Sequence, residues 1–151
     1  MVADDLAGGL HFCLVRRRDH VRPPALSWDG HRSRLVQICI DSPAGSHDQE
    51  VAFWRSALSW RWAASESDEF AGKLFPASGS SAQLLFQRLD EEDAGRAVRG
   101  HIDLGTDDIE ADAQRLVQLG ATRVGHGRGW IVLRDPTGLV FCTTGNSPDG
   151  P

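Results

Sequence analysis

The residues of this chain best suited to chemistry are polar side chains that lie within apolar segments. Gln37 stands in "RLVQICID", His101 and Asp103 in "RGHIDLG", and Cys142 in "LVFCTT". An imidazole can donate, accept or exchange a proton near neutral pH, so His101 is the candidate catalytic acid or base. The amide of Gln37 offers a hydrogen bond to a ligand or to another polar group of the same site.

The spacing of these residues predicts that they occupy strands and share one kind of face. Residues 34–41 alternate, with the apolar side chains opposite Gln37 and Cys39, which we expect to be small filler. Residues 99–105 alternate in the same way, with His101 and Asp103 together. Because residues two apart on a strand are about 7 Å apart, we expect no direct pair between His101 and Asp103. Asp103 is therefore expected at the rim of the site, where it orients His101 or contacts ligand.

Cys142 has two interpretations. It is a buried, inert thiol, or it is a nucleophile that needs a nearby cation or base, such as His101, to lower its pKa. Trp130, together with Phe70 or Phe75, is expected to line an apolar pocket for a planar ligand. The glycines of "GHGRG" (125–129) lack the following helix of a phosphate-binding loop, so they predict a hairpin tip with His126 and Arg128 in solvent.

Helices and turns must position these strands, and the sequence predicts them twice. Ser46, with Gln49 three residues later, predicts a capped helix that ends near Trp60 and buries Val51, Trp54 and Leu58. Candidate strands follow, with a turn at 77–81 and an exposed acidic linker at 90–93.

In the second half, Thr106 is the predicted cap of a helix with acidic residues in its first turn. That helix is expected to bury Ile109, Ala113, Leu116 and Val117 and to stop at Gly120. A type I turn is predicted at residues 135–138.

Together these elements predict an α+β domain of two βαβββ modules, at about 34–89 and 99–145. The modules are expected to form a curved mixed sheet around a cleft, with the helices outside. The domain is assigned to residues 33–146, with a tail at 147–151. Residues 1–32 are predicted to be an N-terminal extension, either disordered or containing a short edge strand.

Composition limits the classes of function. The chain has 151 residues, 40% of them apolar, and a net charge of −5. This charge argues against a nucleic-acid partner, because phosphate binding needs a basic surface. Three widely separated cysteines indicate reduced thiols. No apolar stretch reaches the ~20 residues that span a bilayer, so no membrane partner is expected and the protein is predicted to be cytoplasmic.

The chain resembles the vicinal oxygen chelate superfamily, which includes glyoxalases, bleomycin-resistance proteins and extradiol dioxygenases. The resemblance is carried by "QEVAFWRSALSW", "GHIDLGTDDIEADAQRLVQLGA" and "WIVLRDPTGLVFC". In metal-dependent members, the first strand of each module supplies a His or Gln and the last strand a Glu. The resemblance places Gln37 and His101 at the first-strand positions, and Leu85 and Cys142 where the glutamates would stand.

The resemblance therefore implies a site without the family carboxylates. Hard divalent ions prefer oxygen ligands, so a metal-free cleft without a cofactor is the leading expectation. A set of Gln37, His101 and Cys142 could hold Zn²⁺, and a shifted register would put Gln83 or Gln87 in place of Leu85.

The leading functional expectation is a glyoxalase-like protein that binds an apolar or aromatic small molecule between its modules. The ligand-contacting residues are expected to be Gln37, His101, Asp103, Cys142, Trp130 and Gln87. One alternative is a metal-dependent lyase, isomerase or dioxygenase-type enzyme, with His101 as acid or base. Another is a structural homodimer with a vestigial cleft. The resemblance also implies a homodimer.

Overall fold

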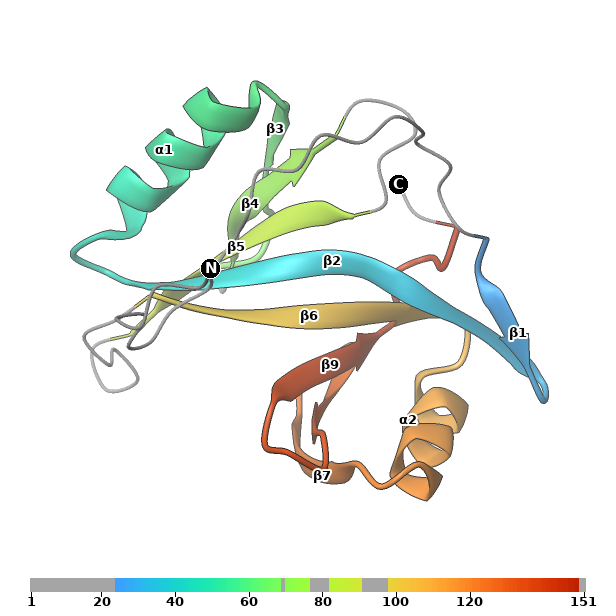
Figure 1. Cartoon of the computed structure of the whole chain (residues 1–151). Coiled ribbons are helices and arrows are strands. Elements are labelled where there is room, and N and C mark those ends of the chain that lie inside the picture. The colour runs from blue at the N-terminus through green and yellow to red at the C-terminus, as the bar shows by residue number, and fades with distance from the viewer. Residues whose placement is uncertain (1–23, 69, 77–81, 91–97, 150–151) are drawn as a thin grey trace, which may run out of the picture. The chain divides into compact units, whose positions relative to one another are not determined.

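The computed structural model describes residues 24–68, 70–76, 82–90 and 98–149, which contain nine strands and two helices. After a short first strand, β1, the elements follow the order β2-α1-β3-β4-β5 and then β6-α2-β7-β8-β9 (Figure 1). This is the βαβββ pattern twice, and the predicted α+β class is confirmed. The chain divides into two compact units, one of residues 39–79 and 84–100, the other of 22–38, 80–83 and 101–151.

The first unit is built on an antiparallel ladder with one helix. The strands are β3 (Arg61–Ala64), β4 (Phe70–Phe75) and most of β5 (Gln83–Leu89), in the order β3-β4-β5. Leu74 and Phe86 are buried, and the Trp62 ring packs 5.9 Å from that of Phe86. Leu85, which stands where a family glutamate was expected, is also a buried apolar residue.

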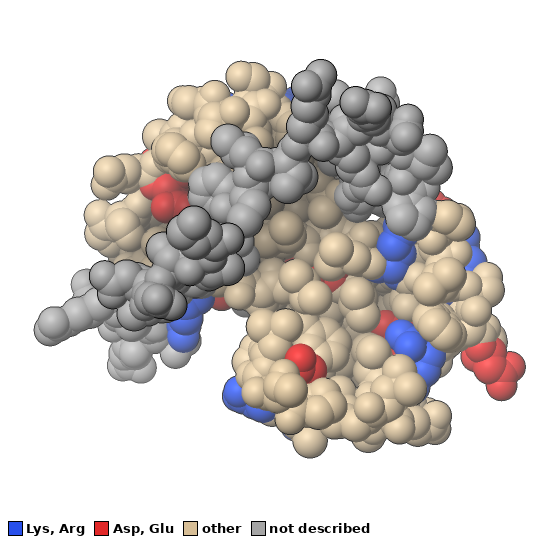
Figure 2. All heavy atoms as spheres, in the orientation of Figure 1, with Lys and Arg blue, Asp and Glu red and all other residues tan. Residues whose placement is uncertain are grey.

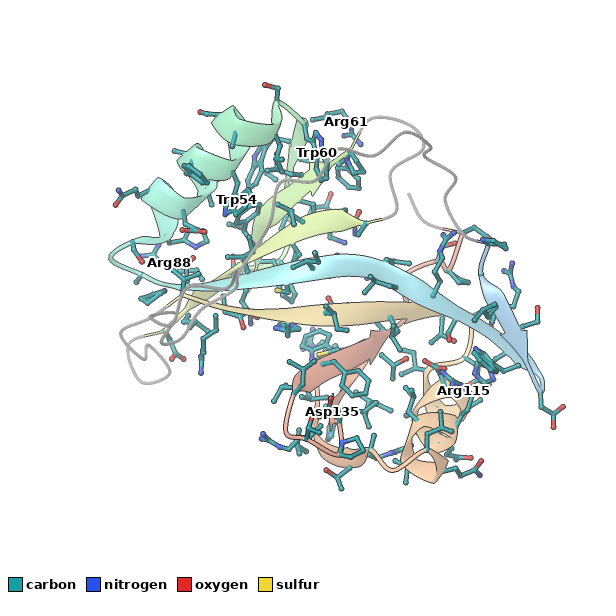
Figure 3. The ribbon with its side chains drawn as sticks, viewed as in Figure 1. Trp54, Trp60, Arg61, Arg88, Arg115 and Asp135 are labelled. Atoms are coloured by element: carbon teal, nitrogen blue, oxygen red, sulfur yellow. The ribbon has the colours of Figure 1, made fainter. Side chains whose placement is uncertain are left out.

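Helix α1 (His47–Leu58) differs from its prediction in two respects. Ser46 precedes the helix, but its side chain makes no capping bond and instead donates to the carbonyl of Pro43. Trp54 is only half-buried, and its indole donates to Glu50 Oε1 at 2.7 Å (Figure 3). The expected core role of Trp54 is therefore wrong, because its polar edge is tied to the surface of its own helix.

The second unit contains β1 (Leu26–Trp28) and the first part of β2 (His31–Pro43), joined as a hairpin. Its other strands are β6 (Arg99–Thr106), β7 (Thr122–His126), β8 (Trp130–Arg134) and β9 (Val140–Thr144). The strand order is β2-β6-β9-β8-β7, with β6 and β9 parallel and β7-β8-β9 antiparallel.

Helix α2 (Ile109–Gln118) packs against β7, β8 and β9. Ala113 of this helix forms a buried core with Ala121, Leu133 and Phe141. The cap is Asp108, whose carboxylate accepts from the backbone N–H of Ala111 at 2.9 Å, so the prediction of Thr106 is wrong. Thr106 instead donates to the carbonyl of Arg32. Gly120 has φ 106°, as the predicted stop requires.

The β8–β9 turn has the expected type of closure, with the backbone N–H of Gly138 donating to the carbonyl of Asp135 at 3.1 Å. Asp135 also accepts from the backbone of Thr137 and Leu139 (Figure 3). These bonds to the carboxylate hold the pKa of Asp135 below its ordinary value.

The ends of the predicted domain are more structured than expected. Residues 26–32, assigned to the extension, contain β1 and the start of β2, while residues 1–23 lie outside the described part of the chain, as do 77–81 and most of the acidic linker. In the tail, Asp149 accepts from Arg32 at 3.1 Å.

Among the described residues, no helix is both long and apolar enough to cross a bilayer. Charges of both signs are interspersed on the face in Figure 2.

Candidate functional site

Three strands of the second unit bring the polar residues together. In the parallel pairing of β6 with β9, Asp103 lies opposite Cys142, and Cys142 lies opposite Val132 of β8. Partners in a ladder share a face of the sheet, and His101 shares it because it is two residues from Asp103. One nitrogen, oxygen or sulfur atom from each of His101, Asp103 and Cys142 lies within 4.8 Å of the others.

A chain of buried hydrogen bonds leads to Asp103. Gln83 Nε2 donates to Gln37 Oε1 at 2.7 Å, and Gln37 Nε2 donates to Asp103 Oδ2. All three side chains are buried, Gln37 to 2% exposure. A buried amide with both ends bonded is fixed in orientation, so Gln37 holds the Asp103 carboxylate in place.

His101 and Asp103 form the pair that the sequence argument excluded. Nε2 of His101 lies 3.3 Å from Oδ1 of Asp103. The exclusion used the spacing of backbone positions, but the two side chains are long enough to close that gap by leaning along the strand. The His101 side chain is 18% exposed and that of Asp103 is 4% exposed. His101 is therefore the member of the pair that solvent or a ligand can reach.

Two buried oxygens of this cluster have no hydrogen-bond donor in the described part of the chain: Asp103 Oδ1 and Gln83 Oε1. The contact of Asp103 Oδ1 with His101 has the distance of an ion pair without the alignment of a hydrogen bond. A buried carboxylate oxygen without a donor is costly, so a cation or a donor group beside it lowers the energy of the site.

Cys142 is a buried thiol held in its neutral form. Burial raises its pKa above the ordinary value near 9, and the charge of Asp103 acts in the same direction, while a hydrogen bond to His101 opposes both. The neutral thiol is a poor nucleophile. The nucleophile interpretation requires a lowered pKa, and the raised pKa of Cys142 argues against it.

Metal-dependent members of the family hold an ion at this place, although a metal-free cleft is the leading expectation for this chain. The predicted set of Gln37, His101 and Cys142 does not fit, because both ends of the Gln37 amide are already bonded within the protein. His101, Asp103 and Cys142 do fit a borderline ion such as Zn²⁺, which accepts nitrogen, oxygen and sulfur ligands. Asp103 of β6 adds to this set a carboxylate that the family pattern did not place there.

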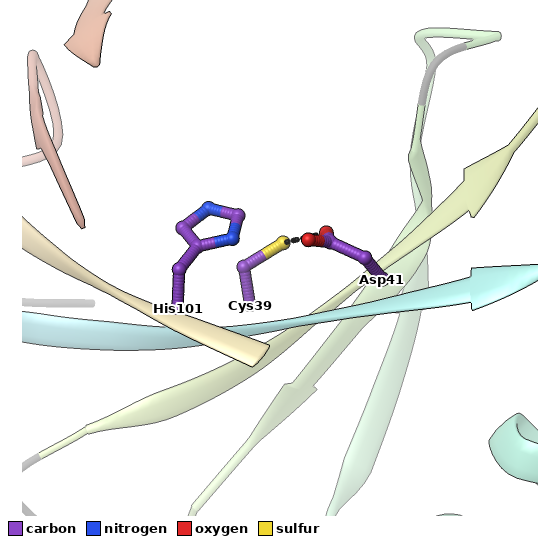
Figure 4. Close-up of side chains that lie close together, drawn as sticks. All are labelled: Cys39, Asp41 and His101. Carbon is purple, nitrogen blue, oxygen red and sulfur yellow. Dashed lines mark hydrogen bonds between the residues drawn. The ribbon is translucent and has the colours of Figure 1, made fainter. Parts of the chain in front are cut away.

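The other predicted ligand residues divide between the two units. Trp130 is on the same face of β8 as Val132, and therefore of Cys142, two ladder pairs further along. Gln87 is half-buried on β5 in the other unit, opposite Phe70 of β4, and Phe75 is in that unit as well. Cys39, also in that unit, is buried, and its thiol donates to Asp41 Oδ1 at 3.4 Å (Figure 4). Cys39 was expected to be a small side chain that only fills space, but its thiol also makes this hydrogen bond.

Sequence reasoning missed a second buried cluster in this unit. The Asp112 carboxylate on α2 is fully buried and accepts from Arg115, from Thr143 Oγ1 and from His31 Nε2 at 2.8, 2.8 and 3.2 Å. Arg115 also stacks on the ring of Trp28, 4.1 Å from its centroid (Figure 3). The burial of Asp112 was not predicted, because an acidic residue in the first turn of a helix is usually exposed. His31 was not considered, because it fell in the segment assigned to the extension. The cluster ties the β1–β2 hairpin to α2 and β9.

Comparison with known proteins identifies the family. The model of the glyoxalase-like domain matches residues 37–144, well over half of the chain. The chain belongs to the glyoxalase-like domain family. This family is part of the vicinal oxygen chelate superfamily, so the resemblance is confirmed. None of the curated proteins matches the chain.

Solved structures agree on the fold. Methylmalonyl-CoA epimerase from Mycobacterium tuberculosis is 15% identical with a TM-score of 0.52, covering 78% of this chain and 87% of its own. A methylmalonyl-CoA epimerase in complex with methylmalonyl-CoA and NH4+ is 21% identical with a TM-score of 0.50, covering 79% and 99%. At these identities the likeness concerns the fold.

Proposed function

We propose that this glyoxalase-like domain binds a small carbonyl compound at the cluster of His101, Asp103 and Cys142 and transfers a proton on it, as a lyase or isomerase does. The observation that supports this most is the buried carboxylate of Asp103, oriented by Gln37 and 3.3 Å from the imidazole of His101. A histidine beside an oriented carboxylate is suited to accept a proton, because the carboxylate stabilises the imidazolium that forms.

In this proposal the ligand carries a hydroxyl on the carbon beside its carbonyl, and His101 removes the C–H proton of that carbon to give an enediolate. His101 then returns the proton to the former carbonyl carbon, while the hydroxyl proton moves to the former carbonyl oxygen, so that the hydroxyl carbon becomes the new carbonyl. Asp103 stabilises the protonated imidazole from 3.3 Å. Cys142 remains a neutral thiol throughout, which is consistent with the raised pKa that burial gives it. Val132 and Trp130, on the same face of the sheet, offer apolar surface to the rest of the ligand.

The test uses the hemithioacetal of methylglyoxal and glutathione as the probe, in deuterium oxide, with NMR detection of isomerisation and of exchange at the carbon beside the carbonyl. The wild type is expected to accelerate one of these, and His101→Asn to lose about 10²–10⁴-fold of that rate. Arg134→Gln is the control, because Arg134 is an exposed residue of the same unit that bonds the Gly138 carbonyl and is not part of the cluster. An inert wild type, or an equal loss in both variants, would contradict the proposal.

A second candidate is a metal-assisted form of the same chemistry, favoured by the oxygen of Asp103 that has no donor. His101, Asp103 and Cys142 would hold the ion. Zinc would polarise a carbonyl of the ligand when bound. Metal analysis of untagged protein distinguishes the two: one equivalent of zinc in wild type and its loss in Asp103→Asn support the metal form. Activity that survives chelation supports the metal-free form.

A further inference from the structure

A groove at the tip of the β7–β8 hairpin is separate in its lining from the cluster of His101, Asp103 and Cys142. It is open to solvent, has a volume of about 490 Å³ and is lined by the start of α2, by β7, by the loop 127–129 and by the start of β8. This volume lies within the ~300–1,000 Å³ typical of sites for small molecules. Of the residues proposed above for the reaction, the lining includes only Trp130.

One wall of the groove is apolar and the rim is cationic. The wall is formed by the half-buried side chains of Ile109, Trp130 and Ile131. On the rim, Arg123 is neutralised by Glu110, with Nη2 2.5 Å from Oε1. The side chains of Arg128 and His126 are exposed and make no hydrogen bond or ion pair to any residue that the structure describes. Arg128 is therefore a surplus positive charge beside an aromatic wall.

Two glycines of the rim, Gly127 and Gly129, differ in whether the surrounding structure leaves room for a larger residue. A side chain at Gly127 would overlap the indole of Trp130, so packing demands glycine there. At Gly129 a Cβ atom would meet nothing within 4 Å, and the backbone is outside the left-handed region. Neither conformation nor packing requires glycine at that position. Bare backbone at Gly129 leaves the groove open, as close approach of a ligand to the main chain requires.

We propose that this groove is a binding site for a small organic anion, with its planar apolar body against Trp130 and Ile131 and its carboxylate or phosphate at Arg128 and His126. A guanidinium suits both anions because its parallel N–H groups match two oxygens. The indole face accommodates a flat ring and excludes water from the charged contact.

The site is tested by titrating isotope-labelled protein with phenyl phosphate, benzoate and inorganic phosphate, followed by NMR. With phenyl phosphate or benzoate, shifts are expected to concentrate at the amides of Gly125, Gly127 and Gly129. Arg128→Gln is expected to weaken this binding about fivefold, as the loss of one solvent-screened charged contact. Arg134→Gln, an exposed arginine of the same unit that bonds the Gly138 carbonyl, should leave it unchanged.

Gly129→Ala should keep the spectrum of the folded protein and weaken binding, because the added methyl group narrows the rim. Three results would overturn the proposal: no shifts at the loop glycines with either aromatic anion, equal weakening by Arg128→Gln and Arg134→Gln, or inorganic phosphate binding as tightly as phenyl phosphate. The last result would show that the apolar wall contributes nothing to binding. Comparing phenyl phosphate with benzoate shows which anion the rim prefers.

Discussion

Replacing Gln37 by leucine tests the hydrogen-bond chain that orients Asp103. Leucine has nearly the volume of glutamine, so no large cavity forms, but Gln83 Nε2 and Asp103 Oδ2 each lose their partner. Each buried group left without a bond costs about 1–3 kcal/mol, so Gln37→Leu is expected to lower the free energy of unfolding by about 2–6 kcal/mol. Urea unfolding followed by circular dichroism measures this, with the midpoint falling at a constant slope.

The double variant makes the test sharper. Gln37→Leu with Gln83→Leu leaves only Asp103 Oδ2 without its donor, so it should be more stable than Gln37→Leu alone by about 1–3 kcal/mol. Gln87→Leu is the control, because Gln87 is half-buried and should change stability by less than about 1 kcal/mol. If Gln37→Leu costs no more than this control, or if the second change adds its full cost, the chain from Gln83 to Asp103 is refuted.

Three further predictions concern local features. Gly127→Ala should lower the free energy of unfolding by about 1–3 kcal/mol because the Trp130 ring must move, while Gly129→Ala should stay within about 0.5 kcal/mol; thermal unfolding compares them. Asp108→Ala should cost about 1 kcal/mol by removing the α2 cap, whereas Ser46→Ala, with no capping bond to lose, should cost little; equal losses would contradict the assignment of the caps. The raised pKa of Cys142 means that its contribution to stability is present below its ordinary value near 9 and is lost as the pH rises above it. Unfolding measured across that range in wild type and Cys142→Ala should show a steeper loss for wild type, and parallel curves would count against a buried thiol.

The sequence could predict the parts that depend on local pattern. Alternation in 34–41 and 99–105 located both strands and the faces that carry Gln37 and His101, and Gly120 marked the end of a helix. Contacts that depend on side-chain reach were not predictable. The His101–Asp103 pair was excluded from backbone spacing alone, and the donor for Gln37 was found only when β5 placed Gln83 beside it.

Helix starts and burial were less predictable for a related reason. Ser46 and Thr106 have the right residue type for a cap, but a hydroxyl can bond other carbonyls nearby, as both do here. Trp54 fits an apolar stripe by spacing, yet its indole N–H finds Glu50 one turn away and remains near the surface. These outcomes are decided by competition among nearby partners, which residue type alone does not rank.

The central claim is that Gln37, His101, Asp103 and Cys142 form one polar cluster on a single face of the second unit. A high-resolution crystal structure of the wild-type chain tests it most directly. We expect the Asp103 carboxylate to accept from the Gln37 amide, with the donor atoms of His101, Asp103 and Cys142 within 4.8 Å of one another. An Asp103 side chain in solvent, or a His101 ring on the face that packs against α2, would contradict it.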